Sequence, residues 1–133
     1  AADGYTIKLT SGYRSYAVQD KLYDYYMDTK GEAWTVQYSA PPGASEHHTG
    51  LAADVSCPSM GYALDDSFAD TEEGIWLRDH AHEYGFIIRY QEGAEDITGY
   101  AYEPWHIRYV GKEAAAVIYE KDITLEEFVR DIK

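Results

Sequence analysis

The residues that most constrain the fold of this chain lie in two short segments far apart in its sequence. One is Ser45-Glu-His-His-Thr-Gly-Leu-Ala-Ala-Asp54, and the other is Glu103-Pro-Trp-His106. Together they hold the histidines and carboxylates that a catalytic zinc site uses: three ligands, an open fourth position, and a carboxylate left free as a base. A fold that builds such a site must place a loop and strand from the first segment beside a strand from the second.

We predict that His47, Asp54 and His106 bind one zinc ion. His47 lies in a loop and Asp54 in the strand that follows, so a turn through Gly50 can bring both side chains to one point. His106 would come from a distant strand. Two neutral imidazoles and one carboxylate leave the site with a net charge of about +1. That charge keeps the ion a Lewis acid able to lower the pKa of a bound water from about 15.7 towards about 7.

Three other histidines compete for the role of ligand. His80 and His82 form a His-x-His pair, which would point to one side on a strand. On the helix predicted there, they point about 200° apart and cannot both bind one ion. His48 adjoins His47 and is the alternative to it.

Size and charge exclude several classes of protein. With 133 residues, the chain is predicted to form a single domain over residues 1–133. Its net charge of −13 argues against nucleic acid, because phosphate binders need a stripe of Lys and Arg. No stretch approaches the roughly 20 apolar residues of a membrane span, so we expect no stable membrane insertion. The single cysteine, Cys57, is predicted to be a small buried side chain rather than a ligand or nucleophile.

Hydrophobic periodicity and the positions of Gly and Pro predict a mixture of helices and strands. Strands are expected from residue 7 to the glycine at 12 and over 51–56, 86–90 and 105–110. Helices are expected over 15–30, 71–84, 112–121 and 124–132, and a loop over 91–98. Val18, Leu22, Tyr25 and Tyr26 would share one face of the first helix, and Thr124 with Glu127 would cap the last. We predict an α+β fold with a small, mostly antiparallel sheet that holds the zinc site between flanking helices.

The set Ser45-x-His47-x-x-Gly50-x-Ala52-x-Asp54, followed by Glu103-x-Trp105-His106, resembles the VanY-type D-alanyl-D-alanine carboxypeptidases. These belong to a group of zinc peptidases that includes lysostaphin-like enzymes and the hedgehog signalling domain. The resemblance extends to Ser11-Gly-Tyr-Arg-Ser and to the segments that begin at Tyr84 and Thr98. One departure is Gln91-Glu-Gly-Ala94, where the family often has a Pro-x-Gly-Lys stretch, so the basic residue is absent.

The resemblance implies a role for each candidate site residue. The zinc ligands would be His47, Asp54 and His106. The catalytic residues would be Glu103 as the base and Arg14 facing the scissile carbonyl. Substrate binding would fall to Gln19 and Ser45. Apart from the resemblance, Tyr13 and Trp105 are candidates to line the cleft and contact substrate, with packing in the core as the alternative for each. Pro104 interrupts the strand ladder, so we expect Glu103 on the turn before the strand, within reach of the water but not bound to the metal.

The resemblance implies a zinc-dependent carboxypeptidase that hydrolyses the terminal D-Ala-D-Ala bond of peptidoglycan stem peptides or precursors. We expect a monomer that acts in the cell envelope, taken there by an N-terminal segment outside this sequence, with a cytoplasmic location as the alternative. Two other readings stay open: an L,D-carboxypeptidase acting on tetrapeptide stems, and a non-catalytic binding domain stabilised by zinc. A carbohydrate-binding module that uses the 14 tyrosines would leave the histidine and aspartate spacing unexplained.

Overall fold

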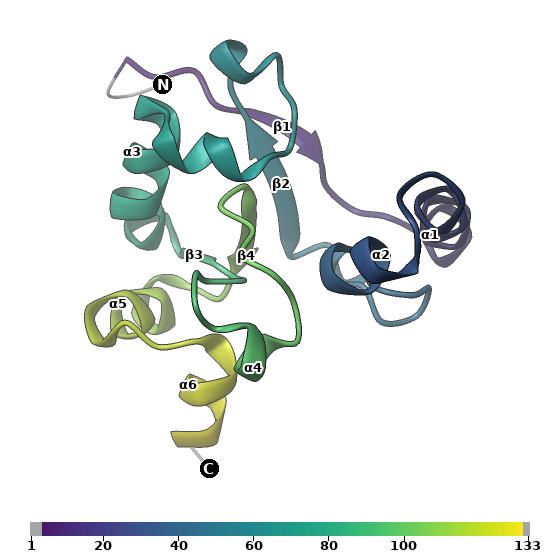
Figure 1. Cartoon of the computed structure of the whole chain (residues 1–133). Helices are drawn as coiled ribbons and strands as arrows, with labels where there is room; N and C mark the ends of the chain where they lie inside the picture. The colour runs from purple at the N-terminus through teal and green to yellow at the C-terminus, as the bar shows by residue number, and fades with distance from the viewer. Residues whose placement is uncertain (1–3, 132–133) are drawn as a thin grey trace.

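A four-stranded antiparallel sheet lies at the centre of the computed structural model, which describes residues 4–131 (Figure 1). The strand order is β1-β2-β4-β3, with β1 at Lys8–Ser11, β2 at Ala52–Ser56, β4 at His106–Tyr109 and β3 at Phe86–Ile88. All three pairs of neighbouring strands run antiparallel. The predicted α+β fold with an antiparallel sheet is therefore confirmed.

The register of the two central strands brings distant parts of the sequence together. Asp54 on β2 pairs with His106 on β4, and Ser11 at the end of β1 pairs with Asp54 from the other side. Residues directly opposite each other in an antiparallel pair project from the same face of the sheet. The register alone therefore places Asp54 and His106 side by side on one face.

Helices flank the sheet on both sides (Figure 1). On one side lie α1 and α2, and on the other α3 and α5, while α4 and α6 lie near the end of β3. Their bounds are Tyr16–Lys30, Glu32–Tyr38, Glu72–His80, Glu95–Thr98, Lys112–Lys121 and Leu125–Asp131 for α1 to α6. Within residues 4–131, every helix is too short or too polar to cross a lipid bilayer.

The first helix begins and ends where predicted but buries a different face. The Ser15 hydroxyl accepts a hydrogen bond from the backbone N–H of Val18, and Gly31 follows the last turn with a φ of +86°. Of the four apolar residues expected on one face, Leu22 and Tyr26 are half-buried, Val18 and Tyr25 are exposed, and Gln19 is the buried residue of the helix. The reason is that α1 packs on α2 and contributes no residue to the main core, while Gln19 forms hydrogen bonds with Arg14 and Ala40.

Several other boundaries differ from the prediction. Helix α2 was not predicted, since a seven-residue segment containing Thr35 and Val36 has weak intrinsic helix propensity. Helix α3 ends at His80 and continues as a 3-10 turn over Ala81–Tyr84, β3 is shorter than expected, and α4 replaces part of a predicted loop. The capping box is confirmed: Glu127 accepts from the Thr124 N–H and donates its own N–H to the Thr124 hydroxyl. The predicted end of that helix at residue 132 lies outside the described residues.

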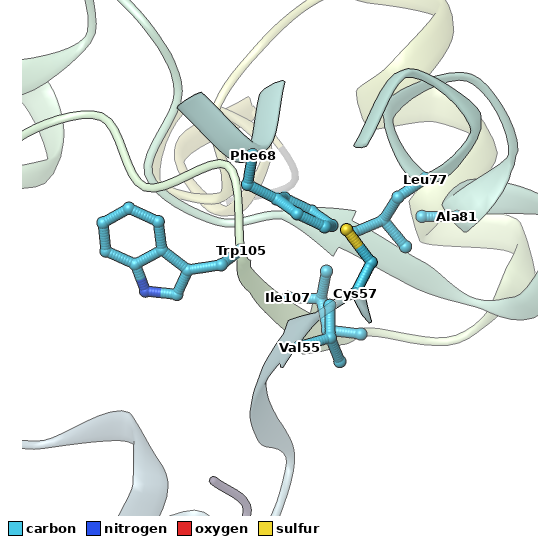
Figure 2. Packing of buried hydrophobic residues seen from close by; sticks show 7 residues of the cluster. All are labelled: Val55, Cys57, Phe68, Leu77, Ala81, Trp105 and Ile107. Carbon is cyan, nitrogen blue, oxygen red and sulfur yellow. The ribbon is translucent and has the colours of Figure 1, made fainter. Parts of the chain in front are cut away.

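The main core contains Val55 and Ile107, the chain neighbours of Asp54 and His106 on the two central strands. Side chains alternate between the two faces of a strand, so the neighbours of these two polar residues point away from them. The buried cluster comprises Val55, Cys57, Phe68, Leu77, Ala81, Trp105 and Ile107. Figure 2 shows Cys57 enclosed by this group with Trp105 at its edge, which confirms the buried position predicted for the cysteine.

Replacement of Gly74 by alanine is expected to destabilise the fold by about 1–3 kcal/mol. A Cβ atom at this position in α3 would lie 1.9 Å from the backbone oxygen of Phe68. Helix propensity alone would favour alanine by about 0.5–1 kcal/mol, so a net loss reports the steric contact. Urea unfolding measures the change, with Ile75→Ala, at a 41% exposed neighbour, as the control. Equal or higher stability of the Gly74→Ala variant would contradict this packing.

Candidate metal centre

The structure brings together the three side chains predicted as zinc ligands. His47 lies on the 3-10 turn Glu46–Thr49, just before β2, while Asp54 lies on β2 and His106 begins β4. All three are buried, and one potential ligand atom of each lies within 4.8 Å of the others. A loop and two neighbouring strands therefore form one group of two imidazoles and a carboxylate.

Hydrogen bonds orient both imidazoles towards the carboxylate. Nδ1 of His47 lies 2.7 Å from the backbone oxygen of Gly12, and Nε2 of His106 lies 3.1 Å from Oε1 of Glu46. The remaining nitrogens face Asp54, with His47 Nε2 at 3.3 Å from Oδ2 and His106 Nδ1 at 2.8 Å from Oδ1. Histidines that bind metals almost always have the second nitrogen held by such an acceptor. The donor set and its orientation fit a zinc ion.

The electrostatics of the group also suit a cation. Burial alone would lower the pKa of His106, but its hydrogen bonds to Asp54 and Glu46 outweigh this effect and raise the pKa to about 9. Burial would likewise raise the pKa of Asp54, yet hydrogen bonds to His106 and His47 lower it to about 2. The carboxylate is therefore ionised, and positive charge on His106 is favoured. Metal binding would displace a proton from His106.

Glu103 lies beside this group with an unused carboxylate oxygen. Its side chain is 6% exposed, and Oε1 lies 4.0 Å from His106 Nδ1. Among the described residues, Oε2 has no hydrogen-bond partner. Burial raises the pKa of Glu103 to about 8, with His106 acting in the opposite direction. The Glu103 carbonyl accepts from the His106 N–H at 3.1 Å across a turn that contains Pro104, so the glutamate precedes the strand, as expected.

Arg14 reaches the group from the loop after β1. Its Nη2 lies 3.3 Å from Asp54 Oδ2, Nη1 donates to Gln19 Oε1 at 2.7 Å, and Nε donates to Ser11 Oγ at 3.1 Å. Its backbone N–H donates to the His47 carbonyl at 3.0 Å, which ties the two loops together. The guanidinium is therefore held in place with one edge towards the candidate ligands.

The four residues predicted to bind substrate occupy different positions. Gln19 is buried and uses its amide to hold Arg14 and to donate to the Ala40 carbonyl at 2.7 Å, so it supports Arg14. The Ser45 hydroxyl accepts from the His47 N–H at 3.2 Å and lines the cleft. Trp105 lines the cleft and also packs in the core. Tyr13 is 69% exposed and is not among the described residues that line the cleft.

A cleft of about 350 Å³ opens over the group. One wall is aromatic and comes from α1 and α2, where Trp34 lies 5.0 Å from both Tyr26 and Tyr38 between ring centroids. The cleft is also lined by Asp65 and Asp66, at the start of a 3-10 turn. Its size and mixed lining suit a peptide of a few residues.

A comparison with models of known protein families assigns the chain to a family. The model of the VanY family, described as D-alanyl-D-alanine carboxypeptidase, matches residues 1–112. The chain belongs to the VanY family.

Individual relatives agree with this VanY-family assignment. The chain is 50% identical to YodJ of Bacillus subtilis (strain 168) over 131 residues, which is 98% of this chain and 48% of YodJ. Among solved structures, the LdcB LD-carboxypeptidase is 50% identical with a TM-score of 0.89, covering 99% of this chain and 62% of LdcB. The E175A mutant of the D,D-pentapeptidase VanY from a VanB-type resistance cassette, in complex with Zn(II), is 35% identical with a TM-score of 0.81. That match covers 96% of this chain and 74% of the VanY mutant chain.

In this VanY-family chain, the other histidines lie outside the group. His48 contacts the Arg14 carbonyl through Nδ1 and the Gly43 N–H through Nε2, so His47 and not His48 joins the group. His80 stacks on Trp76, whereas His82 stacks on Tyr119. The predicted separation of the His-x-His pair is confirmed.

One residue near the metal centre was missed by the sequence reasoning. Glu46 precedes His47 and contacts the imidazole of His106. Its pKa is lowered to about 2, because hydrogen bonds from His106 and Arg89 outweigh the effect of burial. Its place inside the motif was the available signal, but its partners lie too far along the chain to be paired with it by pattern.

Proposed function

We propose that this VanY-family domain is a zinc-dependent carboxypeptidase that removes the terminal D-alanine from a peptidoglycan stem peptide or precursor by hydrolysing the D-Ala-D-Ala bond. The observation that supports this most directly is Glu103, a buried carboxylate with an unpaired oxygen beside three potential zinc ligands. A domain with a purely structural metal has no need of such a group, since a buried polar atom without a partner costs free energy. The family description and the zinc-containing VanY relative support the same function.

The chain's own residues divide the chemistry among them. His47, Asp54 and His106 would hold the ion, which when bound supplies Lewis acidity and lowers the pKa of a water in its open position. Glu103 takes a proton from the attacking water and returns it to the leaving amine. Because burial favours its neutral form, Glu103 is a stronger base than an exposed glutamate and holds the proton taken from the water until the amine leaves.

Arg14 is proposed to stabilise the negative charge that develops on the scissile carbonyl oxygen. Its contacts to Gln19 and Ser11 fix the guanidinium before substrate arrives. A donor that is already in place needs no reorganisation during the reaction, which is why such groups stabilise a transition state more than the bound substrate.

We therefore expect Arg14→Ala to lower kcat by about 10²–10³ with a smaller change in KM. The kcat of Arg14→Lys should lie between those of the wild type and Arg14→Ala. Lysine keeps the positive charge but lacks the forked guanidinium that contacts Gln19 and Asp54. Steady-state kinetics on a stem peptide measures both variants. Arg78→Ala, at a 63% exposed side chain paired with Asp79, is the control. A rise in KM alone would assign Arg14 to substrate binding.

A second candidate is an L,D-carboxypeptidase that releases D-alanine from a tetrapeptide stem. The observation in its favour is the higher identity to the LdcB LD-carboxypeptidase, 50% against 35% for the D,D-pentapeptidase VanY. Incubation with pentapeptide and tetrapeptide stems, followed by mass spectrometry of the products, separates the two. Trimming of the pentapeptide supports the D,D activity, and trimming of the tetrapeptide alone would replace it by the L,D activity.

We propose that the protein acts in the cell envelope, where peptidoglycan stems are exposed, and that it does so as a monomer. Its strongly acidic surface gives no long-range attraction to an anionic cell wall. Recognition would therefore be local, between the cleft and the end of the peptide.

A further inference from the structure

We propose that Glu46 is a positioning residue for His106, and that ion pairs behind it make the C-terminal helix α6 part of the support of the metal site. The inference rests on the proposed zinc site. We call Glu46, Arg89, Arg108 and Glu126 the Glu46 network.

The two oxygens of Glu46 have separate partners. Oε1 lies 3.1 Å from Nε2 of His106. Oε2 accepts from Arg89 Nε at 2.5 Å and from Arg108 Nη1 at 2.9 Å. The side chain of Glu46 is 12% exposed. Two guanidinium groups on one oxygen hold the carboxylate in place and keep it negative, so the other oxygen stays directed at the imidazole.

Together with the contact between Nδ1 and Asp54, this contact fixes the ring orientation in which Nδ1 of His106, and not a ring carbon, faces the metal site. The ring of Tyr90 stacks on the imidazole at 4.8 Å and 20°, which fixes the plane of the ring. Stacking does not distinguish the ring from one rotated by 180°, in which a carbon would replace Nδ1. The acceptor at Nε2 does distinguish them, since a rotated ring would present a carbon to Glu46. It also keeps a proton on Nε2, which leaves the Nδ1 lone pair for the ion.

Arg89 extends the support to the C-terminal helix. Its Nη1 and Nη2 donate to the two carboxylate oxygens of Glu126 at 2.7 and 2.9 Å, while its backbone N–H donates to the His106 carbonyl at 3.2 Å. The Arg89 side chain is 11% exposed and that of Glu126 is 34% exposed, so the arginine end of the pair is shielded and the glutamate end is partly open to solvent. Glu126 lies on α6, beyond residue 112 where the family match ends. A helix outside the matched region is thus linked to His106 by two successive ion pairs, Glu126 with Arg89 and Arg89 with Glu46.

The test is the zinc affinity of Glu46→Gln, measured by competition with a chromophoric chelator. We expect a loss of about 10–100-fold, the usual effect of removing an outer partner of a metal-binding histidine. Glu126→Gln, which leaves the Glu46–His106 contact in place, should lose affinity in the same direction but less. Glu120→Gln, an exposed charge removal on the neighbouring helix α5, is the matched control and should bind zinc as the wild type does.

A second readout separates positioning from general destabilisation. In the zinc-loaded protein, the Nε2–H proton of His106 should be protected from exchange in the wild type and exchange faster in Glu46→Gln. Unfolding of the metal-free variants reports any loss of fold. Unchanged zinc affinity together with an unchanged Nε2–H signal in Glu46→Gln would overturn the proposal. If Glu46→Gln does not fold, Glu126→Gln decides, and wild-type zinc affinity in that variant would overturn it.

These measurements do not depend on peptide hydrolysis. A wild-type protein that binds zinc but cleaves no stem peptide would contradict the proposed function and leave the Glu46 assignment standing. A wild-type protein that cleaves stem peptides, with a Glu46→Gln variant whose zinc affinity and Nε2–H exchange are unchanged, would support the proposed function and overturn the Glu46 assignment.

Discussion

Replacement of Glu103 by glutamine is expected to lower the rate of stem-peptide hydrolysis by about 10²–10⁴-fold while the protein keeps its fold and its zinc. Glutamine has nearly the same shape but cannot accept the proton of the attacking water. Because Glu103 lies outside the group of candidate ligands, with its nearest oxygen 4.0 Å from His106, the ion should stay bound. Initial rates give the first quantity and metal analysis of the purified variant the second.

The Glu103→Gln variant should also show how much the buried glutamate lowers the stability of the folded, metal-free protein. The pKa of Glu103 in the folded, metal-free protein is about 8, above its ordinary value of 4.5, so the folded state binds this proton more tightly than the unfolded chain. The contribution of Glu103 to stability is therefore most favourable below about pH 4.5 and is lost as the pH rises through about 8. Without metal, Glu103→Gln should gain stability relative to the wild type across this range, measured as unfolding midpoints at several pH values.

Two outcomes would contradict these expectations in different ways. Normal hydrolysis by Glu103→Gln would refute the assignment of Glu103 as the base. Zinc binding without hydrolysis by the wild type would favour the non-catalytic domain stabilised by zinc. Glu113→Gln, in the exposed first turn of α5, is the matched control for the loss of one carboxylate and should change neither activity nor zinc content.

Strand alternation carried enough information to predict the face on which the metal group forms. It placed Asp54 on the same face of its strand as Ala52 and His106 on the same face as Arg108, and the register then paired Asp54 directly with His106. The break at Pro104 similarly predicted the position of Glu103 ahead of the strand. These predictions succeeded because each depends on local geometry, with residue types that have few other uses in such a pattern.

Predictions that depended on tertiary contacts were less successful. Glu46 contacts Arg89 and Arg108, which lie 43 and 62 residues further along the chain, and no local pattern pairs them. Gln19 was assigned to substrate, yet both ends of its amide are engaged, with Arg14 and Ala40. The apolar face expected on α1 is only half-buried for a related reason. Periodicity reports which residues are apolar, but it does not report that the helix borders an open cleft instead of the main core.

Removal of the metal is expected to abolish hydrolysis and to lower the melting temperature, and addition of zinc should restore both. A ligand that binds only the folded state stabilises it by about 4 kcal/mol at 1,000 times its dissociation constant. For this chain the effect should be marked, because without the ion the buried group holds two imidazoles, Asp54 and Glu103 in close contact. Thermal unfolding with graded zinc and with chelator measures it.

Asp54→Asn tests whether that effect comes from the predicted site. Asparagine keeps the shape of the side chain but removes the charge and weakens a zinc ligand, so the variant should lose both activity and the rise in melting temperature on zinc addition. It should also lose part of the support of Arg14, which lies 3.3 Å from Asp54. Glu120→Gln again serves as the control, with a zinc response equal to that of the wild type. Purified protein that hydrolyses stem peptides at full rate with no detectable metal would contradict the zinc site. It would also contradict the mechanism in which Glu103 takes a proton from a water activated by zinc.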